Sequence, residues 1–277
     1  MAESAFQTQY RQEFIKGFEK RESLVRKTVV KEFMRQGNAA VFLVADSGGA
    51  SAVTRGLNGD IPTRPDNLTQ NTATLVEWHD VPEKTGFNIF ASQSNQRQIM
   101  QMTSMAVVNR KIDTDINVAL ATGSLNWGSA AAATMNLIKT AKTKLANNFA
   151  TDNADDVFAQ ITPAYHAYLM GFDQFVSVDY VQDKAFEGVS KSTAFNWYGV
   201  NWIVNAGLAG TGSSDATCFM YNRQAIGHAC DTETMKTHVG FDEKNDKSWC
   251  RNSVFMGSKL LQNSGVILMP HDDSAFS

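Results

Sequence analysis

The sequence predicts an α+β fold, and three observations support this class. Apolar residues recur with helical spacing in some segments and alternate as in strands in others. These segments follow one another without the regular strand–helix alternation that produces a parallel α/β sheet. At 277 residues, of which 43% are hydrophobic and 19% charged, the chain can bury one large core or two moderate ones.

Residues 4–34 are predicted to form an amphipathic helix. The apolar side chains that recur along it are Phe6, Tyr10, Phe14, Phe18, Val25, Val29 and Phe33. Residues 1–35 also hold eight Lys and Arg against five Glu, a local charge of +3, which leaves −6 for the remainder because the whole chain carries −3. This helix is expected either to pack on its own domain with a solvated charged face or to be an arm that binds a partner.

Residues 39–45 form the first predicted strand, and residues 73–81 alternate like a second, half-buried one. Between them, residues 46–72 are rich in Gly, Asn, Thr and Pro and hold almost no large apolar side chain. Such a long connection is uncommon inside a compact domain, so it is predicted to be a lid, a disordered tip or a hairpin that leaves its own subunit. Because an isolated hairpin is marginally stable in water, the last alternative requires a neighbouring molecule.

The clearest helix is predicted over residues 92–121, with Ser92 or Ser94 as its N-cap and Gly123 after its end. Its apolar stripe consists of Ile99, Met102, Met105, Ala106, Ile112, Ile116 and Leu120. Thirty residues span about 45 Å at 1.5 Å per residue, which exceeds the width of a small domain. The helix is therefore expected to act as a beam.

Charged residues near the end of this helix resemble those of an active site in their regularity. Asp113 and Asp115 lie about 200° apart around the helix axis, so they cannot share a proton or a metal ion. Lys111 and Asp115 have the spacing of an ion pair. The charges of Arg110, Asp113 and Asp115 are therefore interpreted as the surface of a long helix, and any further role requires another chain.

The remaining elements are predicted, in chain order, as a helix over 133–149, a strand and short helix over 153–172, a strand over 195–210, a strand and helical turn over 217–230, and strands over 236–269. The tail residues His271, Asp272 and Asp273 are expected to be solvated.

The search for catalytic motifs finds no phosphate-binding loop, serine-hydrolase elbow or zinc-protease motif. The densest set of potential metal ligands is His228, Cys230, His238 and Cys250. Zinc sites use closely spaced ligand pairs, and only His228 and Cys230 are close in sequence. Ordinary half-buried residues are the preferred interpretation and a metal-dependent enzyme is the alternative, so no catalytic residue, cofactor or metal is predicted.

Composition narrows the compartment and the partners. The net charge of −3 predicts neither nucleic-acid nor acidic-membrane binding for the whole molecule. The longest apolar run, residues 39–45, is too short to span a bilayer, and the first residues lack the pattern of a secretory signal. Three cysteines without a CxxC pair favour a reducing cytoplasm.

Four stretches occur in a recognisable order: VVNRKIDTDINVALATGS (107–124), FAQITPAYHAYLMGFDQFVSVDY (158–180), WYGVNWIVNAGL (197–208) and CFMYNRQAIGHAC (218–230). The most specific pieces are the QAIGHA segment and the pattern of Arg110, Ile112, Asp113, Ile116, Ala119 and Leu120. Together they resemble major capsid proteins of tailed bacteriophages, which have the Hong Kong 97-type fold. The resemblance covers roughly residues 35–270.

The resemblance implies a division of the chain into four parts. These are an N-terminal arm (1–44), an extended loop (45–81), a peripheral domain with a long spine helix (82–124 and 222–261) and an axial domain (125–221 and 262–277). Some relatives join subunits covalently through a Lys in the extended loop. Residues 46–73 contain Arg55 and Arg64 but no Lys, so this cross-link is not expected here.

The function implied by the resemblance is self-assembly of hexamers and pentamers into an icosahedral virion shell around phage double-stranded DNA, in the cytoplasm of a bacterial host. A portal and a separate scaffolding protein are expected as partners, the latter because only about forty residues precede the fold. Contact with DNA is expected to be weak and non-specific, without a membrane. Contacts between subunits are expected at Arg55, Arg64, Arg110, Asp113 and Asp115. An encapsulin-type bacterial nanocompartment, which has the same fold, is the alternative.

Overall fold

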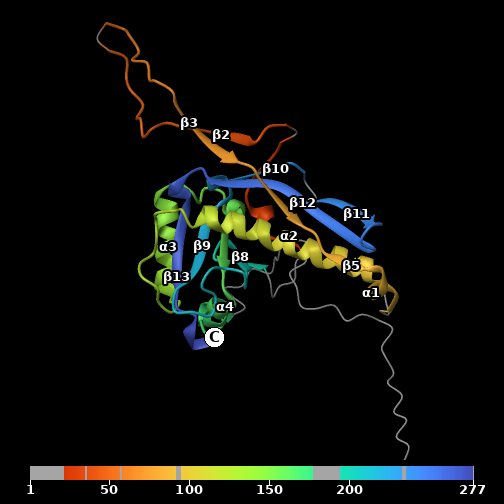
Figure 1. The fold of residues 1–277 in the computed structure, drawn as a ribbon. Helices are drawn as coiled ribbons and strands as arrows, with labels where there is room; N and C mark the ends of the chain where they lie inside the picture. Colours follow the sequence, from red (N-terminus) through yellow and green to blue (C-terminus); the bar gives the residue numbers. More distant parts are fainter. Residues whose placement is uncertain are drawn as a thin grey trace, which may run out of the picture.

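Two sheets, a long helix and a projecting hairpin make up the molecule (Figure 1). The computed structural model describes residues 22–34, 36–56, 58–91, 95–176, 194–232 and 235–276. Within these ranges, no helix combines the length and the hydropathy needed to cross a membrane.

The first sheet is organised around one long strand, β12 (Lys247–Leu260). Its main path runs β1-β10-β12-β11, and β4 and β5 also pair with β12. The other strands are β1 (Val30–Phe33), β4 (Val76–Asp80), β5 (Glu83–Thr85), β10 (Ile226–Cys230) and β11 (Lys236–Asp242). Among the described strands of this sheet, β1 and β10 pair in parallel and the other pairs are antiparallel. β12 therefore joins segments from the beginning and the end of the chain.

The second sheet has the order β13-β9-β6-β8-β7. Its strands are β6 (Val157–Ile161), β7 (Ala194–Trp197), β8 (Val200–Val204), β9 (Ala216–Asn222) and β13 (Val266–His271). Helix α3 (Met135–Asn147) lies beside β13 in Figure 1, α4 (Pro163–Leu169) follows β6, and α5 (Asp173–Val176) is a single turn. Large buried side chains such as Phe158, Trp202 and Tyr221 fill the core.

The long helix α2 (Gln96–Leu120) runs along the first sheet beside β12, preceded by the short α1 (Gly86–Ala91). Ile112, Ile116 and Leu120 are fully buried in the main core, as the predicted stripe requires. Met105 in the first half of the helix is instead exposed. The predicted caps Ser92 and Ser94 lie outside the described residues, and the N-cap is Asn95, whose side chain accepts a hydrogen bond from the backbone N–H of Gln98.

Most predicted elements are confirmed, with three refinements. The second strand, predicted over 73–81, is divided into a strand over Asn67–Thr74, which begins inside the predicted connection, and β4, which pairs with β12. The strand expected over 195–210 is a hairpin, because Tyr198 and Gly199 both have positive φ and turn the chain between β7 and β8. The helical turn expected after β9 is a 3₁₀ turn, Arg223–Ala225, and the chain then continues as β10. Further 3₁₀ turns span Ala154–Asp156, Asn263–Gly265 and Ser274–Phe276.

The helix predicted over residues 4–34 is wrong for its described part. Residues Val25–Thr28 form a 3₁₀ turn, and β1 follows, paired along the edge of β10. Val29 and Val30 are β-branched and favour extended backbone beside an available strand edge. The pairing in the sheet therefore overrides the helical spacing, whereas residues 4–21 lie outside the described part of the chain.

The tail is also packed rather than solvated. His271 and Asp273 are fully buried, and His271 Nδ1 lies 2.5 Å from Asp273 Oδ1. The hydroxyl of Thr162 and the backbone N–H of Gly212 donate to the same carboxylate at 2.8 and 3.0 Å. The last strand thus ends in a buried polar cluster that closes the second sheet, a role that the short polar tail does not reveal by itself.

Candidate functional site

The first predicted strand and the segment that follows it form a hairpin with two different faces. β2 (Ala39–Asp46) pairs with β3 (Asn67–Thr74) in an antiparallel ribbon that pairs with no other strand among the described residues. Alternate side chains of a strand point to opposite faces, and cross-strand partners share a face. Ala40, Phe42 and Ala73 therefore share one face, and Val41, Leu43 and Leu68 share the other.

The inner face of the ribbon rests on its own subunit. Phe42, Ala40 and Ala73 form a small buried cluster with Ala229 of β10. A Cβ atom on Gly227 would lie 2.9 Å from the ring of Phe42, so the aromatic ring fills the space that a side chain would occupy. The base of the hairpin is consequently fixed to the body of its own subunit.

The outer face is apolar and exposed. Val41, Leu43 and Leu68 are 52%, 66% and 57% exposed. Beyond the paired strands, residues 47–66 extend away from the body, as Figure 1 shows, and Val53 and Ile61 are also exposed large apolar side chains. Several exposed large apolar side chains in one region are typical of a surface that contacts another protein.

The charged residues predicted in this tip are exposed. Arg64 donates from Nη1 to the carbonyl oxygen of Ser47 at 3.1 Å, which ties the two sides of the tip together. Within the described part of the subunit, no ion pair involves Arg55, Asp60 or Asp66. Contact of Arg55 and Arg64 with a neighbouring subunit stays a prediction.

The charged residues of the helix have identified roles inside the subunit. Asp113 is buried and accepts a hydrogen bond from the hydroxyl of Ser23, which fixes the described N-terminal segment to α2. Asp115 accepts from Ser258 Oγ of β12 at 2.5 Å. Lys111 has the spacing to pair with Asp115, but the described residues show no ion pair between them, and Lys111 Nζ lies 3.8 Å from the ring centroid of Trp78. Their contact with another subunit, and that of the exposed Arg110, stays untested.

These contacts belong to a polar ladder that sequence reasoning missed. Arg97 donates to Ser248 Oγ at 3.3 Å, and the hydroxyl of Ser104 donates to the carbonyl of Asp80 at 3.3 Å. Together with Lys111 and Asp115, these helix residues stand seven, seven and four positions apart, so they share one face. This spacing can be read from the sequence and could have revealed these contacts. It identifies the face of α2 that lies on the first sheet.

His228 lies next to this ladder in β10. Ser258 uses its single hydroxyl hydrogen on Asp115, so His228 Nδ1 donates to Ser258 Oγ at 2.9 Å. Nε2 is then the bare acceptor of a neutral ring, buried without a hydrogen-bond partner in the described ranges. Burial, reinforced by the positive charges of Arg26 and Lys31, lowers the pKa of His228 to about 4.

The four potential metal ligands do not form a cluster. Among the described residues, no three His, Cys, Asp or Glu side chains are placed to hold a metal ion together. His228 bonds to a serine, Cys230 Sγ accepts from Arg26 Nη2 at 3.0 Å, and His238 is exposed on β11. Burial has the largest effect on the pKa of the Cys230 and Cys250 thiols and raises both. A raised pKa disfavours the thiolate form, which is the form that binds zinc.

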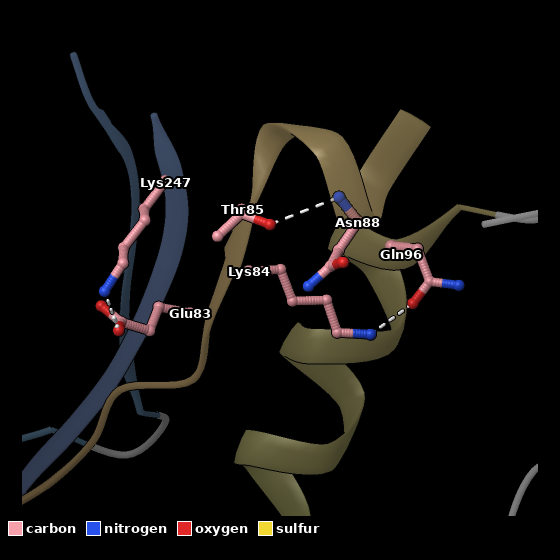
Figure 2. Close-up of a pocket in the computed structure, with 6 residues that line it drawn as sticks. All are labelled: Glu83, Lys84, Thr85, Asn88, Gln96 and Lys247. Carbon is pink, nitrogen blue, oxygen red and sulfur yellow. Dashed lines mark hydrogen bonds and ion pairs between the residues drawn. The ribbon is translucent and has the colours of Figure 1, made fainter. Parts of the chain in front are cut away.

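A polar pocket of about 620 Å³ lies where β5, α1, α2 and β12 meet. Figure 2 shows its lining residues Glu83, Lys84, Thr85, Asn88, Gln96 and Lys247. Lys247 Nζ pairs with Glu83 Oε1 at 2.5 Å, whereas Lys84 donates to the side-chain oxygen of Gln96. Sequence reasoning did not predict this pocket, because its residues come from segments more than 150 positions apart.

Comparison with known protein families gives a match over nearly the whole chain. The sequence matches the family described as phage capsid protein over residues 2–273. The fold is similar to the capsid structure of the cyanophage P-SCSP1u, with a TM-score of 0.72 and 12% identity over 96% of this chain and 93% of that chain. A structure from Mycobacterium phage Che8 gives a TM-score of 0.74 and 12% identity over 97% and 98% of the two chains.

The capsid of a native GTA particle is also similar, with a TM-score of 0.72 and 11% identity over 98% of this chain and 96% of that chain. At such identities the similarity to each solved structure concerns the fold, which is of the Hong Kong 97 type. A search of curated proteins found no match.

Proposed function

The chain belongs to the phage capsid protein family, and from this premise we propose how it builds the shell of the virion. It is a shell-forming capsid protein, and its role is structural. Each subunit inserts its hairpin into a contact with the next copy, so that the exposed outer face and tip become buried only on assembly. Individually modest contacts then stabilise the shell collectively, because a subunit in a lattice makes several at once.

The observation that carries this proposal is the contrast between the two faces of one ribbon. Phe42 on the inner face is buried against Gly227, whereas Leu43, the next residue, is 66% exposed on the outer face. A two-stranded ribbon with one free apolar face is marginal in water. A neighbouring copy supplies the missing cover, and Arg55 and Arg64 meet acidic groups there.

The arrangement of the shell follows from the same premise. Residues 1–44 act as the arm, 45–81 as the extended loop, 82–124 with 222–261 as the peripheral domain, and 125–221 with 262–277 as the axial domain. Hexamers and pentamers form an icosahedral lattice in the bacterial cytoplasm with a portal and a scaffolding protein. Double-stranded DNA contacts the inner surface weakly, as expected for a chain with a net charge of −3.

Replacement of the tip tests this proposal. Residues 47–66 are exchanged for an Asn-Gly turn, which closes the hairpin directly because Asp46 already pairs with Asn67. The variant is expected to give a soluble subunit with the thermal unfolding of the parent but no closed shells in electron micrographs. Shells of normal size and yield from this variant would refute the proposed role of the hairpin.

A further inference from the structure

Three residues other than glycine have a positive φ among those that the structure describes: Phe149, Tyr198 and Asp246. Two of them have a reason within the subunit. Tyr198 turns the chain between β7 and β8, and Lys142 Nζ lies 4.0 Å from the centroid of its ring. The carboxylate of Asp246 packs so closely against Gly86 that a Cβ atom there would lie 2.6 Å from it. Phe149 differs from both, because its side chain is 79% exposed.

Phe149 ends helix α3 in a Schellman motif. The backbone N–H of Phe149 donates to the carbonyl oxygen of Ala146 at 2.9 Å, and that of Ala150 donates to the carbonyl oxygen of Leu145 at 3.1 Å. This motif places the residue after the C-cap in the left-handed region, and Phe149 has a φ of 58°. Glycine usually occupies the position, because a Cβ atom is strained there. Phenylalanine therefore makes the free subunit less stable than glycine would.

The strained residue is held in place from both sides. The side-chain amide of Asn148 donates to the carbonyl oxygen of Ser264 at 3.1 Å, and that of Asn222 donates to the carbonyl oxygen of Ala150 at 2.7 Å. The ring of Phe149 nevertheless belongs to neither apolar cluster of the described residues. Backbone strain persists where the surrounding structure enforces it, and it concentrates at functional sites. A rigid frame thus displays the ring without using it in the core.

We infer that Phe149 is an interface anchor whose ring inserts into an apolar surface of a second copy of this chain. Large aromatic side chains are the usual anchors of protein–protein interfaces. The inference rests on the proposed function, in which copies of one subunit surround each other in the shell. It adds a contact that is separate from the hairpin and that explains why a strained, exposed ring occupies a glycine position.

Two observations favour a second copy as the partner. Residues 145–151 carry no charge, so the surface around the ring does not attract a polyanion such as DNA. The anchor also lies on the side of the body from which the hairpin leaves, where α3 stands in Figure 1. Leu261, whose carbonyl oxygen accepts a hydrogen bond from Asn71 of β3, is three residues before Ser264. A copy that meets the hairpin can therefore also reach Phe149.

Substitution of Phe149 separates assembly from stability. Phe149→Gly relieves the backbone strain, so the subunit is expected to melt about 2–4 °C higher, whereas the yield of closed shells in cells is expected to fall at least about tenfold. Phe149→Tyr keeps the ring and should retain the yield within about twofold. Lys139→Ala, at an exposed position of α3, serves as control and should change neither readout. Melting is followed by circular dichroism in the tip-replaced background, which keeps every variant unassembled.

A photo-cross-linker identifies the partner. Benzoyl-phenylalanine in place of Phe149 is expected, on irradiation of shells, to give a product with the mass of two subunits. A product that contains a different protein, or no product, would overturn the inference. So would a normal yield of shells with Phe149→Gly, or a lower melting temperature of that variant, because the ring would then support its own subunit. If tip replacement abolishes shells while Phe149→Gly does not, only the anchor is wrong; normal shells after tip replacement would instead refute the proposed function.

Discussion

Acidification is expected to destabilise the subunit through His228, which is fully buried between β1 and β12 within the first sheet. Its ring is neutral and donates from Nδ1 to Ser258, so a second proton on Nε2 would create a buried cation without an acceptor. Arg26 and Lys31 add positive charge nearby.

The size of the effect follows from linkage. The pKa of His228 is about 4 in the folded subunit, against an ordinary value of 6.5. The unfolded chain therefore takes up the proton first as the pH falls, and the free energy of unfolding decreases from above pH 6.5 down to pH 4. The whole difference corresponds to about 3 kcal/mol, of which about 2 kcal/mol is lost by pH 5.

The assay is urea denaturation of the tip-replaced subunit, followed by tryptophan fluorescence between pH 7.5 and pH 5. His228→Gln keeps a neutral polar side chain and removes the titration. The gap in unfolding free energy between parent and variant is expected to narrow by about 2 kcal/mol at pH 5. His238→Gln, at an exposed position of β11, serves as control and should follow the parent. Unfolding free energies of parent and His228→Gln that fall in parallel would contradict the reasoning.

Two further substitutions test the packing that positions the hairpin and closes the second sheet. Asp273→Ala leaves His271 buried without its partner and should lower the free energy of unfolding by about 3–5 kcal/mol in urea denaturation, against little change for the exposed Asp152→Ala; a loss below about 1 kcal/mol would contradict a structural role. Gly257→Ala places a Cβ 2.1 Å from the carbonyl oxygen of Thr74 at the end of the hairpin, and we expect a loss of at least about 2 kcal/mol, with faster hydrogen exchange in β3. Unchanged exchange in β3 would count against this close contact.

The helices were predictable because their pattern is local. The stripe formed by Ile112, Ile116 and Leu120 repeats within one segment, and burial on one face follows from it. β1 was missed because its strand state depends on β10, almost 200 residues later. Residues four apart, such as Val25 and Val29, lie on one face in a helix and also in a strand. Their spacing therefore does not distinguish the two states, and the available edge of β10 decides.

A projecting hairpin was among the predicted alternatives because residues 46–72 are rich in Gly, Asn, Thr and Pro and hold few large apolar side chains. The contact of the hairpin base with the body was not predictable, because Phe42 packs against Gly227, a residue far away in the sequence. The pocket was not predictable, since Lys84 and Lys247 become neighbours only when β5 pairs with β12. The seven-residue spacing of the polar residues in α2 can be read from the sequence. Polar residues on a helix are nevertheless expected to face solvent, unless it is known that a sheet packs against them.

The polar ladder of α2 holds this helix and strand β12 in one fixed arrangement. Arg97 joins α2 to Ser248 near the pocket, and Asp115 joins the same helix to Ser258 near the hairpin base. Two bonds at separate points along one helix and one strand oppose sliding and rotation of either element against the other. The hairpin base rests on β10, which pairs with β12, so these bonds also fix the direction in which the hairpin leaves the body. Because a closed ring of copies requires every contact to repeat the same rotation, we expect the bond of Asp115 to Ser258 to favour the proposed assembly from inside the subunit, whereas contact of Arg110, Asp113 and Asp115 with a neighbour stays a prediction.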